Sequence, residues 1–368
     1  MPPALKWGHF PSNFRFQFSH ASASRASTSN IIVNVQDKDG ASGFGEGCPR
    51  SYVTGETEET AAAFVSKYGP SFIDACVDLP AIRDWIHKHE TKISQNPAAF
   101  AAIETALLDM LAQREGLPIE KYLGYRPLEA PMRYSAVLGD SSPRKTGIAA
   151  FVYSVVGFAD FKIKLSTKVD RDRRKLARLP QAATIRVDAN NLWQEAVPCI
   201  GHIREIGRNI WAIEEPLAAG DVSGMQNVSQ ELNAAVILDE SLINVSQLSQ
   251  YSGRPGNWIA NIRVSKCGGL LRSIELANAA QAQGMDVILG AHVGETSLLT
   301  RAAMTVGQAL SKAPLAREGA FGKFLLRQDI SQSSLTFGKS GVLNPDRYLL
   351  SRNPGIGLSV ADDRVRWA

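Results

Sequence analysis

Three acidic residues each follow a short apolar run, and two lysines alternate with apolar residues in a fourth run. The acids are Asp188 in TIRVD, Glu214 in IWAIEE and Asp239 in AVILDE, and the lysines are Lys162 and Lys164 in DFKIKL. Because side chains alternate across a strand, both lysines share one face and each acid faces away from the apolar residue before it. Converging carboxylates without His or Cys favour a hard cation, most simply Mg²⁺. We predict that these acids bind Mg²⁺, although any one alone is more typical of a helix cap or an ion pair.

The stretch ANIRVSKCGG, residues 260–269, contains two basic residues, and their positions decide which one faces the same site. Ile262 and Val264 belong to the outward apolar set of a strand, so Arg263 is expected to face inward and Lys266 is not. A β-bulge would reverse this assignment. Lys266 therefore stays a candidate for substrate contact.

These residues belong to a series of short apolar strands that begins after Pro131, with helical stretches between them. Successive strand ends lie about 25 residues apart, the length of one βα unit. Seven or eight such units favour a closed parallel barrel, which carries catalytic groups at the C-terminal ends of its strands. An open doubly wound sheet is the alternative, but no glycine-rich nucleotide motif follows the first strand. The predicted strands are 133–138, 160–165, 184–188, 210–215, 235–240, 257–264 and 285–290.

The first third of the chain has a different pattern. Residues 14–47 alternate as strands around a DKDG turn and a small polar loop at 19–30, and helical spacing follows from Thr57 to Gly124. We therefore expect an α+β capping domain over residues 1–128 and a barrel over residues 129–325. The remaining segment, 326–368, is expected to return to the capping domain.

The composition is that of an ordinary globular protein, with 44% hydrophobic and 21% charged residues and a net charge of +4. The basic cluster at 168–178 lacks interleaved aromatic residues and is typical of a solvated helix, so nucleic-acid binding is not expected. Four separated cysteines favour reduced thiols, and no apolar run is long enough for a signal peptide or a membrane span. A soluble cytoplasmic protein is predicted.

Five motifs in order resemble the enolase superfamily, specifically its muconate-lactonising subgroup of muconate cycloisomerases, dipeptide epimerases and o-succinylbenzoate synthases. Residues 101–124 also resemble the end of the family's capping domain, and residues 43–60 resemble the capping loop of dipeptide epimerases. The match covers nearly the whole chain. The five motifs are KIK at 162–164, VDANN at 187–191, IEEP at 213–216, LDES at 238–241 and SKCGG at 265–269.

The resemblance implies a modified TIM barrel, (β/α)7β, with an N-terminal α+β capping domain. It implies an enzyme that uses Mg²⁺, or Mn²⁺ in its place, to remove the proton α to a carboxylate and form an enediolate held by the metal. Lys164 would be the base, with its pKa lowered by Lys162, which also helps to hold the substrate carboxylate. The implied partners are a small-molecule carboxylate substrate and further copies of the chain.

Two features depart from the family pattern. The family usually has a second lysine at the position of Arg263, and arginine is a poor base but a good fixed cation. This favours one-base cycloisomerisation or syn elimination, with a racemase or epimerase of an amino-acid or dipeptide derivative as the alternative, and a non-catalytic acid-binding homologue as a third hypothesis. The connection from Lys164 to Asp188 is also short, which predicts a trimmed helix or a shifted strand register.

Further candidates for substrate contact lie in loops. Arg25 in HASASR is an anion ligand or a solvated side chain, and Tyr52 and Thr54 in SYVTGE line a pocket or form a turn. In GAHVGETS, His292 is a second acid–base group or a hydrogen-bonded structural residue, and Glu295 orients a basic residue. Asn190 in VDANN completes the set of predicted contacts.

Overall fold

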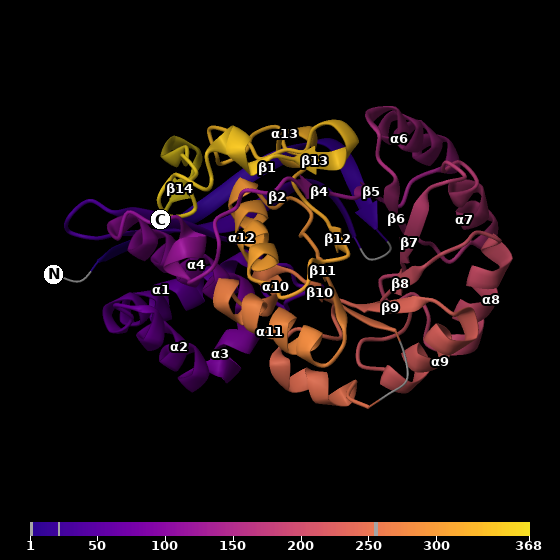
Figure 1. Cartoon of the computed structure of the whole chain (residues 1–368), viewed down its shortest axis with the longest axis horizontal. Coiled ribbons are helices and arrows are strands. Elements are labelled where there is room, and N and C mark those ends of the chain that lie inside the picture. The colour runs from indigo at the N-terminus through magenta and orange to yellow at the C-terminus, as the bar shows by residue number, and fades with distance from the viewer. Residues whose placement is uncertain (1–2, 21–22, 254–256) are drawn as a thin grey trace.

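The computed structural model describes residues 3–20, 23–253 and 257–368, with side chains omitted for 17–20 and 23–25. Two bodies form the molecule in Figure 1, a cap that contains the first helices and strands and a barrel that contains the rest. Among the described residues, none of the helices has both the length and the apolar character needed to cross a bilayer.

Eight parallel strands form the barrel, and their order in the sheet is their order in the chain. The backbone N–H of Ser135, just before the first strand, donates to the Arg317 carbonyl of the last strand at 2.8 Å, which closes the ring. This confirms the predicted fold class. The strands are β5 (Ala136–Leu138), β6 (Asp160–Lys164), β7 (Thr184–Asp188), β8 (Ala212–Glu214), β9 (Ala235–Leu238), β10 (Trp258–Ile262), β11 (Asp286–Leu289) and β12 (Ala316–Arg317).

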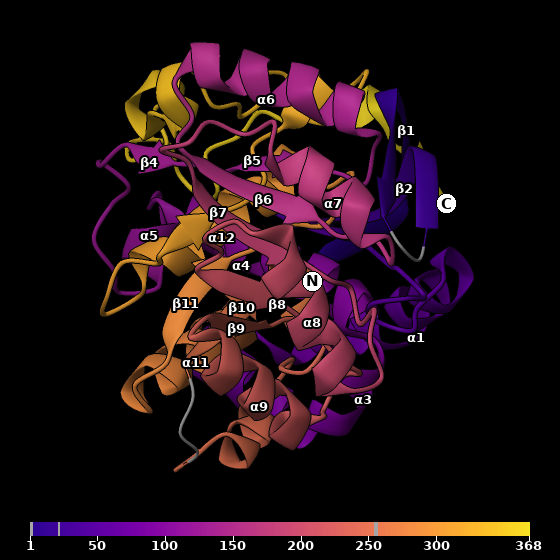
Figure 2. The same cartoon turned by 90° about the vertical axis from the view of Figure 1, so that its right-hand side faces the viewer.

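Helices surround the barrel strands on the outside, as Figures 1 and 2 show. Serine and proline begin α6 and glycine ends it, since Ser142 caps its first turn and Gly157 adopts a left-handed φ of 99° after its last residue. The helices are α6 (Pro143–Val156), α7 (Val169–Leu176), α8 (Ala196–Ile206), α9 (Val222–Leu232), α10 (Val264–Cys267), α11 (Leu270–Ala282), α12 (Ser297–Gln308) and α13 (Gly322–Leu325), with a 3₁₀ turn at η1 (Val245–Gln250).

The alternation of side chains along the strands separates the barrel interior from the layer beneath the helices. A small apolar cluster fills the interior. Ala212 lies two residues before Glu214, and Ile237 lies two residues before Asp239, so each acid points to the same face of its strand as a member of this cluster. The predicted inward orientation of the acids is thus confirmed. The cluster comprises Ala212, Ala235, Ile237, Ile259, Ile288 and Ala316.

Two of the expected elements differ from the prediction. The run 133–138 is divided, because β4 (Met132–Arg133) pairs with β13 (Val342–Leu343) and only β5 joins the barrel. The eighth strand, β12, has two residues, which is too short to give an apolar pattern.

The cap consists of an antiparallel sheet covered by helices. Three glycines of β3, at positions 43, 45 and 47, lie against α4 so closely that a Cβ on any of them would approach the helix backbone to within 2.2 Å. The sheet contains β1 (Ala4–His20), β2 (Ala23–Gln36), β3 (Ser42–Gly47) and β14 (Arg366–Trp367), and the helices are α1 (Glu58–Ala75), α2 (Leu79–Lys88), α3 (Glu90–Gln95), α4 (Pro97–Arg114) and α5 (Ile119–Tyr122).

The polar segment 19–30, expected to be a loop, is mostly strand. Its described residues extend β1 to His20 and begin β2 at Ala23, because the two strands pair along their backbones regardless of the small side chains.

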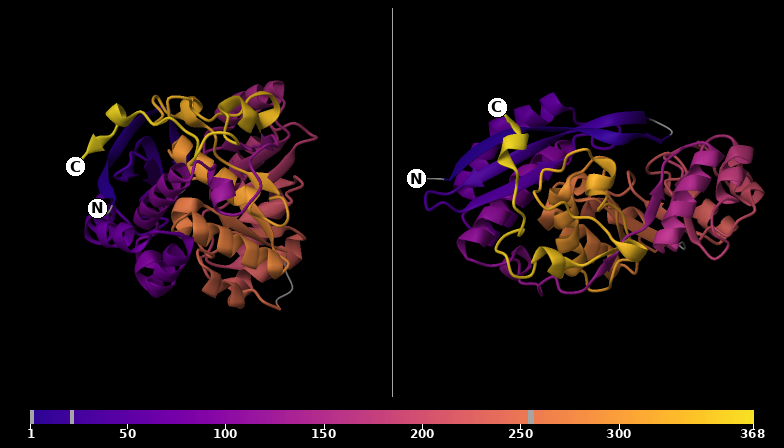
Figure 3. Two further views of the ribbon diagram at one scale, coloured as in Figure 1. Left: turned by 60° about the vertical axis from the view of Figure 1, so that its left-hand side comes forward. Right: turned by 90° about the horizontal axis from the view of Figure 1, so that it is seen from above.

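At the other end of the chain, β14 pairs with β1 through Gly8 and Trp367. Figure 3 shows the C-terminal segment running alongside the molecule to the cap. The domain boundaries at residues 128 and 325 stay predictions.

Buried acids join the cap to the barrel. Glu46 of β3 accepts hydrogen bonds from the backbone of Thr296 and Leu299 at the start of α12, and Glu104 of α4 accepts from the first two residues of α11. A carboxylate at a helix N-terminus satisfies free N–H groups and complements the helix dipole. Each acid therefore ties one element of the cap to one barrel helix.

The third contact across this junction is a buried ion pair. Glu120 of α5 binds Arg301 of α12 through both oxygens, at 2.6 and 2.9 Å, and both side chains are fully buried. The Thr305 hydroxyl also donates to Glu120 at 2.6 Å. Two parallel bonds between guanidinium and carboxylate fix the relative position of the two helices.

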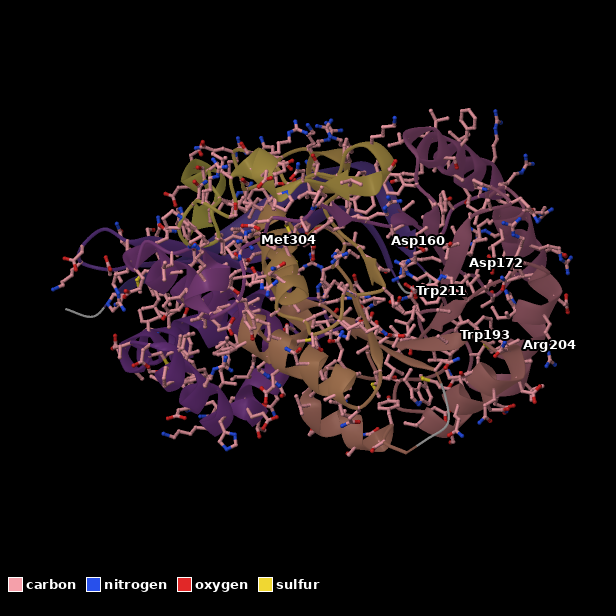
Figure 4. All side chains as sticks on the ribbon, viewed as in Figure 1. Asp160, Asp172, Trp193, Arg204, Trp211 and Met304 are labelled. Atoms are coloured by element: carbon pink, nitrogen blue, oxygen red, sulfur yellow. The ribbon has the colours of Figure 1, made fainter. Side chains whose placement is uncertain are left out.

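We predict that Glu120→Gln lowers the free energy of unfolding by about 3–5 kcal/mol, because it leaves the buried Arg301 guanidinium without its counter-charge. Urea unfolding followed by circular dichroism measures the change. The control is Glu231→Gln, which removes an exposed pair with Arg204 at the edge of the molecule (Figure 4) and should cost less than about 1 kcal/mol. Equal losses in the two variants would contradict the importance of the buried pair.

Candidate active site

Lys162 lies at the centre of a buried charge cluster at the C-terminal ends of the barrel strands. Its ammonium group lies 3.1 Å from Asp188, 2.7 Å from Glu214 and 3.2 Å from Glu318, and its side chain is only 2% exposed. Burial alone would lower the pKa of Lys162, but the three carboxylates outweigh burial and raise the pKa above its usual range. Lys162 is therefore a fixed positive charge that holds the acids together.

Lys164 is the more accessible of the two lysines, with 10% of its side chain exposed. Its ammonium contacts one oxygen of Asp188 at 3.0 Å and the Asn190 side-chain carbonyl at 2.7 Å. The short connection to β7 contains the eight-residue helix α7, and Lys164 still pairs with Asp188 in the sheet. The connection therefore contains a short helix and leaves Lys164 beside Asp188 in the sheet.

Arg263 and Lys266 both reach Asp239, from different elements. Arg263 extends from the end of β10, and its guanidinium contacts Asp239 closely and Glu214 at 3.3 Å. Its inward orientation agrees with the strand parity.

Lys266 requires a correction, because the chain becomes helical at Val264 and turns its side chain back into the protein. Its ammonium contacts the Asp239 carboxylate at 3.0 Å and three backbone carbonyls at 2.6–3.1 Å, and the residue is 1% exposed. The expectation that Lys266 faces away from the site is therefore wrong, because the side chain contacts Asp239, and its contact with substrate stays a prediction.

The three acids predicted to bind metal lie on neighbouring strands and carry unequal proton affinities. Burial raises the pKa of Glu214 to about 8, with Lys162 opposing and the neighbouring carboxylates of Asp188 and Glu318 adding to the rise. The pKa of Asp188 is lowered instead, since Lys162 and Lys164 together outweigh its burial. The same holds for Asp239, whose pKa Arg263 and Lys266 lower against the effect of burial.

Mg²⁺ is the ion that these acids suit by donor type. Within the part of the chain that the structure describes, no three His, Cys, Asp or Glu side chains form a ready-made metal group, and each acid contacts a basic side chain instead. Yet Oε2 of Glu214 and Oδ2 of Asp239 are buried and make no hydrogen bond of normal geometry to any residue that the structure describes, despite the cations beside them. Oxygen atoms with free acceptor capacity and no His or Cys nearby fit a hard cation.

The loop after β11 brings His292 and Glu295 to the same end of the barrel. Among the described residues, neither ring nitrogen of His292 has a hydrogen-bond partner, although His292 is only 4% exposed. Burial and the charges of Arg263 and Arg50 lower the pKa of His292 well below its usual range, so the ring is neutral. Glu295 accepts a bond from the His292 backbone N–H at 2.9 Å, and the charge of Arg263 opposes the rise that burial causes in its pKa. Its predicted role in orienting a basic residue stays a prediction.

The cap holds this loop in position. Asn30 donates to the Gly294 carbonyl at 2.8 Å, and Arg50 donates to the Val293 carbonyl at 3.3 Å. Arg50 also bonds to the side chains of Thr28 and Asn30, so the loop after β3 and the loop after β11 form one network. The cap thereby shapes the open end of the barrel.

A cavity of about 440 Å³ opens beside His292 and Glu318, between the ends of β5, β11 and β12. Among the described residues that line it, Tyr52, Thr54 and Asn190 do not occur. Tyr52 is 36% exposed, and Thr54 bonds within its own turn to Arg50 and Glu56. The side chain of Arg25 lies outside the described residues, so its predicted role stays a prediction.

Two buried residues of the charge cluster, Glu318 and Arg186, were not anticipated from the sequence. Glu318 follows the two-residue strand β12, so no pattern marked it. Arg186 bonds to Glu318 at 3.0 Å, and its parity with Asp188 in TIRVD is a signal that could have revealed it. Asn261 donates to Glu214 at 3.1 Å and has the parity of Arg263.

The fold and the charge cluster define a barrel enzyme whose acidic and basic groups gather at the strand ends. Residues 10–124 match the mandelate racemase / muconate lactonizing enzyme N-terminal domain, and residues 148–364 match the enolase C-terminal domain-like family. The chain therefore belongs to this family and is an enzyme of the enolase superfamily, in its muconate-lactonizing subgroup.

Similar proteins include epimerases and cycloisomerases. The hydrophobic dipeptide epimerase of Enterococcus faecalis is 26% identical over 76% of this chain and 79% of its own length. The chloromuconate cycloisomerase of Cupriavidus pinatubonensis is 25% identical over 92% of this chain and 90% of its own. The structure of the Methylococcus capsulatus dipeptide epimerase complexed with Mg and the dipeptide L-Arg-D-Lys superposes with a TM-score of 0.82, at 26% identity, over 97% of this chain and 99% of that one.

We predict that Glu295 makes folding stability depend on pH. Burial raises its pKa from 4.5 to about 8, so between these values the folded protein holds a proton that the unfolded chain has released. Stability should therefore fall as the pH rises through this window, by as much as ~4 kcal/mol.

Glu295→Gln mimics the protonated side chain and should remove this part of the pH dependence. Urea unfolding of both proteins at pH 5, 6, 7 and 8 measures the difference. Parallel stability curves for the variant and the wild type would show that Glu295 is ionised throughout. Glu231→Gln, on the exposed surface, serves as the control and should leave the curve unchanged.

Proposed function

We propose that the protein is a Mg²⁺-dependent enzyme that removes the proton α to a substrate carboxylate with Lys164. The reaction would then be completed on the same face of the substrate, as a cycloisomerisation or a syn elimination. The observation that carries this proposal is the arginine at position 263. Its guanidinium contacts Asp239 and Glu214 as a fixed cation, at the position where a second base opposite Lys164 would be expected.

Lys164 is the better of the two lysines for proton transfer. Lys162 is bound by three carboxylates that stabilise its ammonium form, whereas Lys164 contacts one carboxylate and one amide and is more exposed. A base must release and accept its proton near the operating pH, and a lysine held by fewer anions does so more readily. Lys164 would take the α-proton and return it, or deliver it to a leaving group, on one face.

Arg263 is unsuited to act as the second base. Burial would lower the pKa of its guanidinium, but Asp239, Glu214 and Glu240 outweigh burial and raise the pKa further. The side chain therefore stays protonated throughout catalysis. Its role would be to stabilise the negative charge that develops on the substrate when Lys164 removes the proton.

Asp188, Glu214 and Asp239 would hold the metal through their carboxylate oxygens. When bound, Mg²⁺ would withdraw electron density from the substrate carboxylate and so acidify the α-proton. Lys162 would limit the repulsion among these acids, and Lys266 would hold Asp239 in place from behind. The Mg in the Methylococcus capsulatus epimerase structure supports this choice of ion, and we expect Mn²⁺ to substitute for it.

An epimerase is the second candidate function, and His292 is the observation that favours it. Its ring nitrogens have no partner in the described part of the chain and the ring lines the cavity, so His292 would be available as an acid–base group on another face of the substrate. Several of the similar proteins are epimerases or racemases. A non-catalytic homologue would lack the Lys164 chemistry altogether.

The cellular setting is part of the proposal. A cytoplasmic location is supported by the four cysteines, which are widely separated in the sequence and buried in the structure. The predicted homo-oligomer and the absence of nucleic-acid and membrane partners stay predictions.

We predict that the enzyme exchanges the α-proton of its substrate in D₂O with retention of configuration. A library of carboxylates, amino-acid derivatives and dipeptides with Mg²⁺, followed by mass spectrometry and chiral chromatography, measures this. Lys164→Ala should slow exchange by about 10²–10⁴-fold, because it removes the general base. Arg263→Lys, which keeps the positive charge, should retain exchange.

His292→Asn separates the two candidate reactions. Retained configuration with activity in His292→Asn supports one-base chemistry. Inversion that disappears in His292→Asn would establish the epimerase instead. Exchange that persists in Lys164→Ala would dismiss Lys164 as the base.

We also predict that Asp239→Asn weakens Mg²⁺ binding by at least about tenfold, or ~1.4 kcal/mol, because an amide is a poorer ligand than a carboxylate. Isothermal titration calorimetry of the metal without substrate gives the dissociation constant. The matched control is Asp286→Asn, which lies at the opposite end of a barrel strand and pairs with Lys312 on the surface. An unchanged dissociation constant in Asp239→Asn would remove this acid from the metal site.

A further inference from the structure

A second hollow, called the C-terminal groove below, lies between residues 323–348 and Arg364. Its volume is about 460 Å³, and within the described part of the chain it shares no lining residue with the cavity beside His292. The short helix α13 (Figure 1) contributes to both walls, because Lys323 lines the groove whereas Gly322 and Leu325 line the cavity. The groove is therefore a separate site, outside the charge cluster at the strand ends.

Four exposed cationic side chains line the C-terminal groove, and none of them forms an ion pair with a residue that the structure describes. Elsewhere on the surface, Arg173 and Arg204 are also exposed, but they pair with Asp170 and Glu231. The groove thus gathers positive charge that the protein itself does not neutralise. The four cations are Lys323, Arg327, Arg347 and Arg364.

Asp329 is the one acid among the described lining residues, and its carboxylate is already occupied. One oxygen accepts from the backbone N–H groups of Ser297 and Ser331, at 3.1 and 3.2 Å. The other oxygen accepts from the hydroxyls of Ser297 and Ser334, at 2.6 and 2.5 Å. Asp329 is only 5% exposed, so it belongs to the wall of the groove and leaves the four cations without a counter-charge.

Acids close to the groove in the sequence do not supply this counter-charge either. Asp346 and Asp363 each precede one of the arginines, but they neither line the groove nor pair with a cation that the structure describes. Asp362 pairs with Lys6 at 3.0 Å. The residues outside the described part of the chain include no Asp or Glu, so their side chains cannot provide the missing negative charge.

The donors around the groove suit an anion with several oxygen atoms. Three of the four cations are arginines, and a guanidinium offers two parallel N–H donors to a phosphate or a carboxylate. Gln328, Gln332 and Ser333 add exposed neutral polar groups. Cations that surround a hollow also add their potentials there, which favours a ligand with more than one negative charge.

We propose that the C-terminal groove binds a small molecule that carries a phosphate monoester. A phosphate monoester concentrates about 1.5 to 2 negative charges and three acceptor oxygens in one group, which matches several converging donors better than a single carboxylate does. The groove also has the size of a small-molecule site, since such sites range from roughly 300 to 1,000 Å³. The inference does not rest on the proposed function, because none of these residues belongs to the charge cluster.

Two double variants of equal charge change test the site. Arg327→Gln with Arg347→Gln removes two guanidinium groups from the groove. Arg144→Gln with Arg174→Gln is the matched control, since these exposed arginines lie on α6 and α7 and do not line the groove. Substitutions at exposed, unpaired arginines should leave the fold intact, which circular dichroism checks.

Isothermal titration calorimetry of the full chain without Mg²⁺ and at low ionic strength measures the binding of glycerol 1-phosphate. Malonate, a dianion without phosphate, is the comparison ligand. We expect glycerol 1-phosphate to bind at least about tenfold more tightly than malonate. The groove variant should weaken its binding by at least about tenfold, because charge-assisted hydrogen bonds are lost, and the control variant should change it less than about twofold.

Three results would overturn the inference. The first is no binding of glycerol 1-phosphate, or an equal loss of binding in the two double variants. The second is binding of malonate as tight as that of glycerol 1-phosphate, which would make the groove a general anion site. The third is binding of a single-stranded oligothymidylate, but not of glycerol 1-phosphate, that the groove variant abolishes, because the groove would then be a nucleic-acid surface.

Discussion

The burial of opposed charges at the end of the barrel is the constraint on which the rest of the structure depends. Lys162 contacts three carboxylates in a site that is almost closed to water, and Arg186, Arg263 and Lys266 contact the same group of acids. A buried charge is tolerated only when it is paired and hydrogen-bonded. Closed packing around the cluster, from the apolar barrel interior below to the cap, keeps these pairs in register.

The cap contributes to the site mainly through the loop after β11. Glu46, Asn30 and Arg50 bind that loop or the start of α12, so the position of His292 depends on residues more than two hundred positions earlier in the chain. The His292 loop depends on the cap because a helix N-terminus and free carbonyl groups need hydrogen-bond partners, and here the cap supplies them. The cap is therefore part of the active-site wall.

The proposed function gives Arg263 and Lys164 different roles. A guanidinium that stays protonated would confine proton transfer to Lys164, unless His292 acts from another face. The cavity beside His292 and Glu318 has mainly apolar walls, and its lining comes from other elements than the strand ends that carry Lys164 and Arg263.

The sequence by itself determined the strand ends and the inward orientation of Asp188, Glu214 and Asp239, because side-chain alternation is a local property of a strand. For the same reason it placed Lys162 and Lys164 on one face of their strand. Only the tertiary structure revealed Glu318, since a two-residue strand has no periodicity, and the true orientation of Lys266, since the chain turns helical after Arg263. The cavity was also beyond prediction, because its walls come from distant elements that closure of the barrel and docking of the cap bring together.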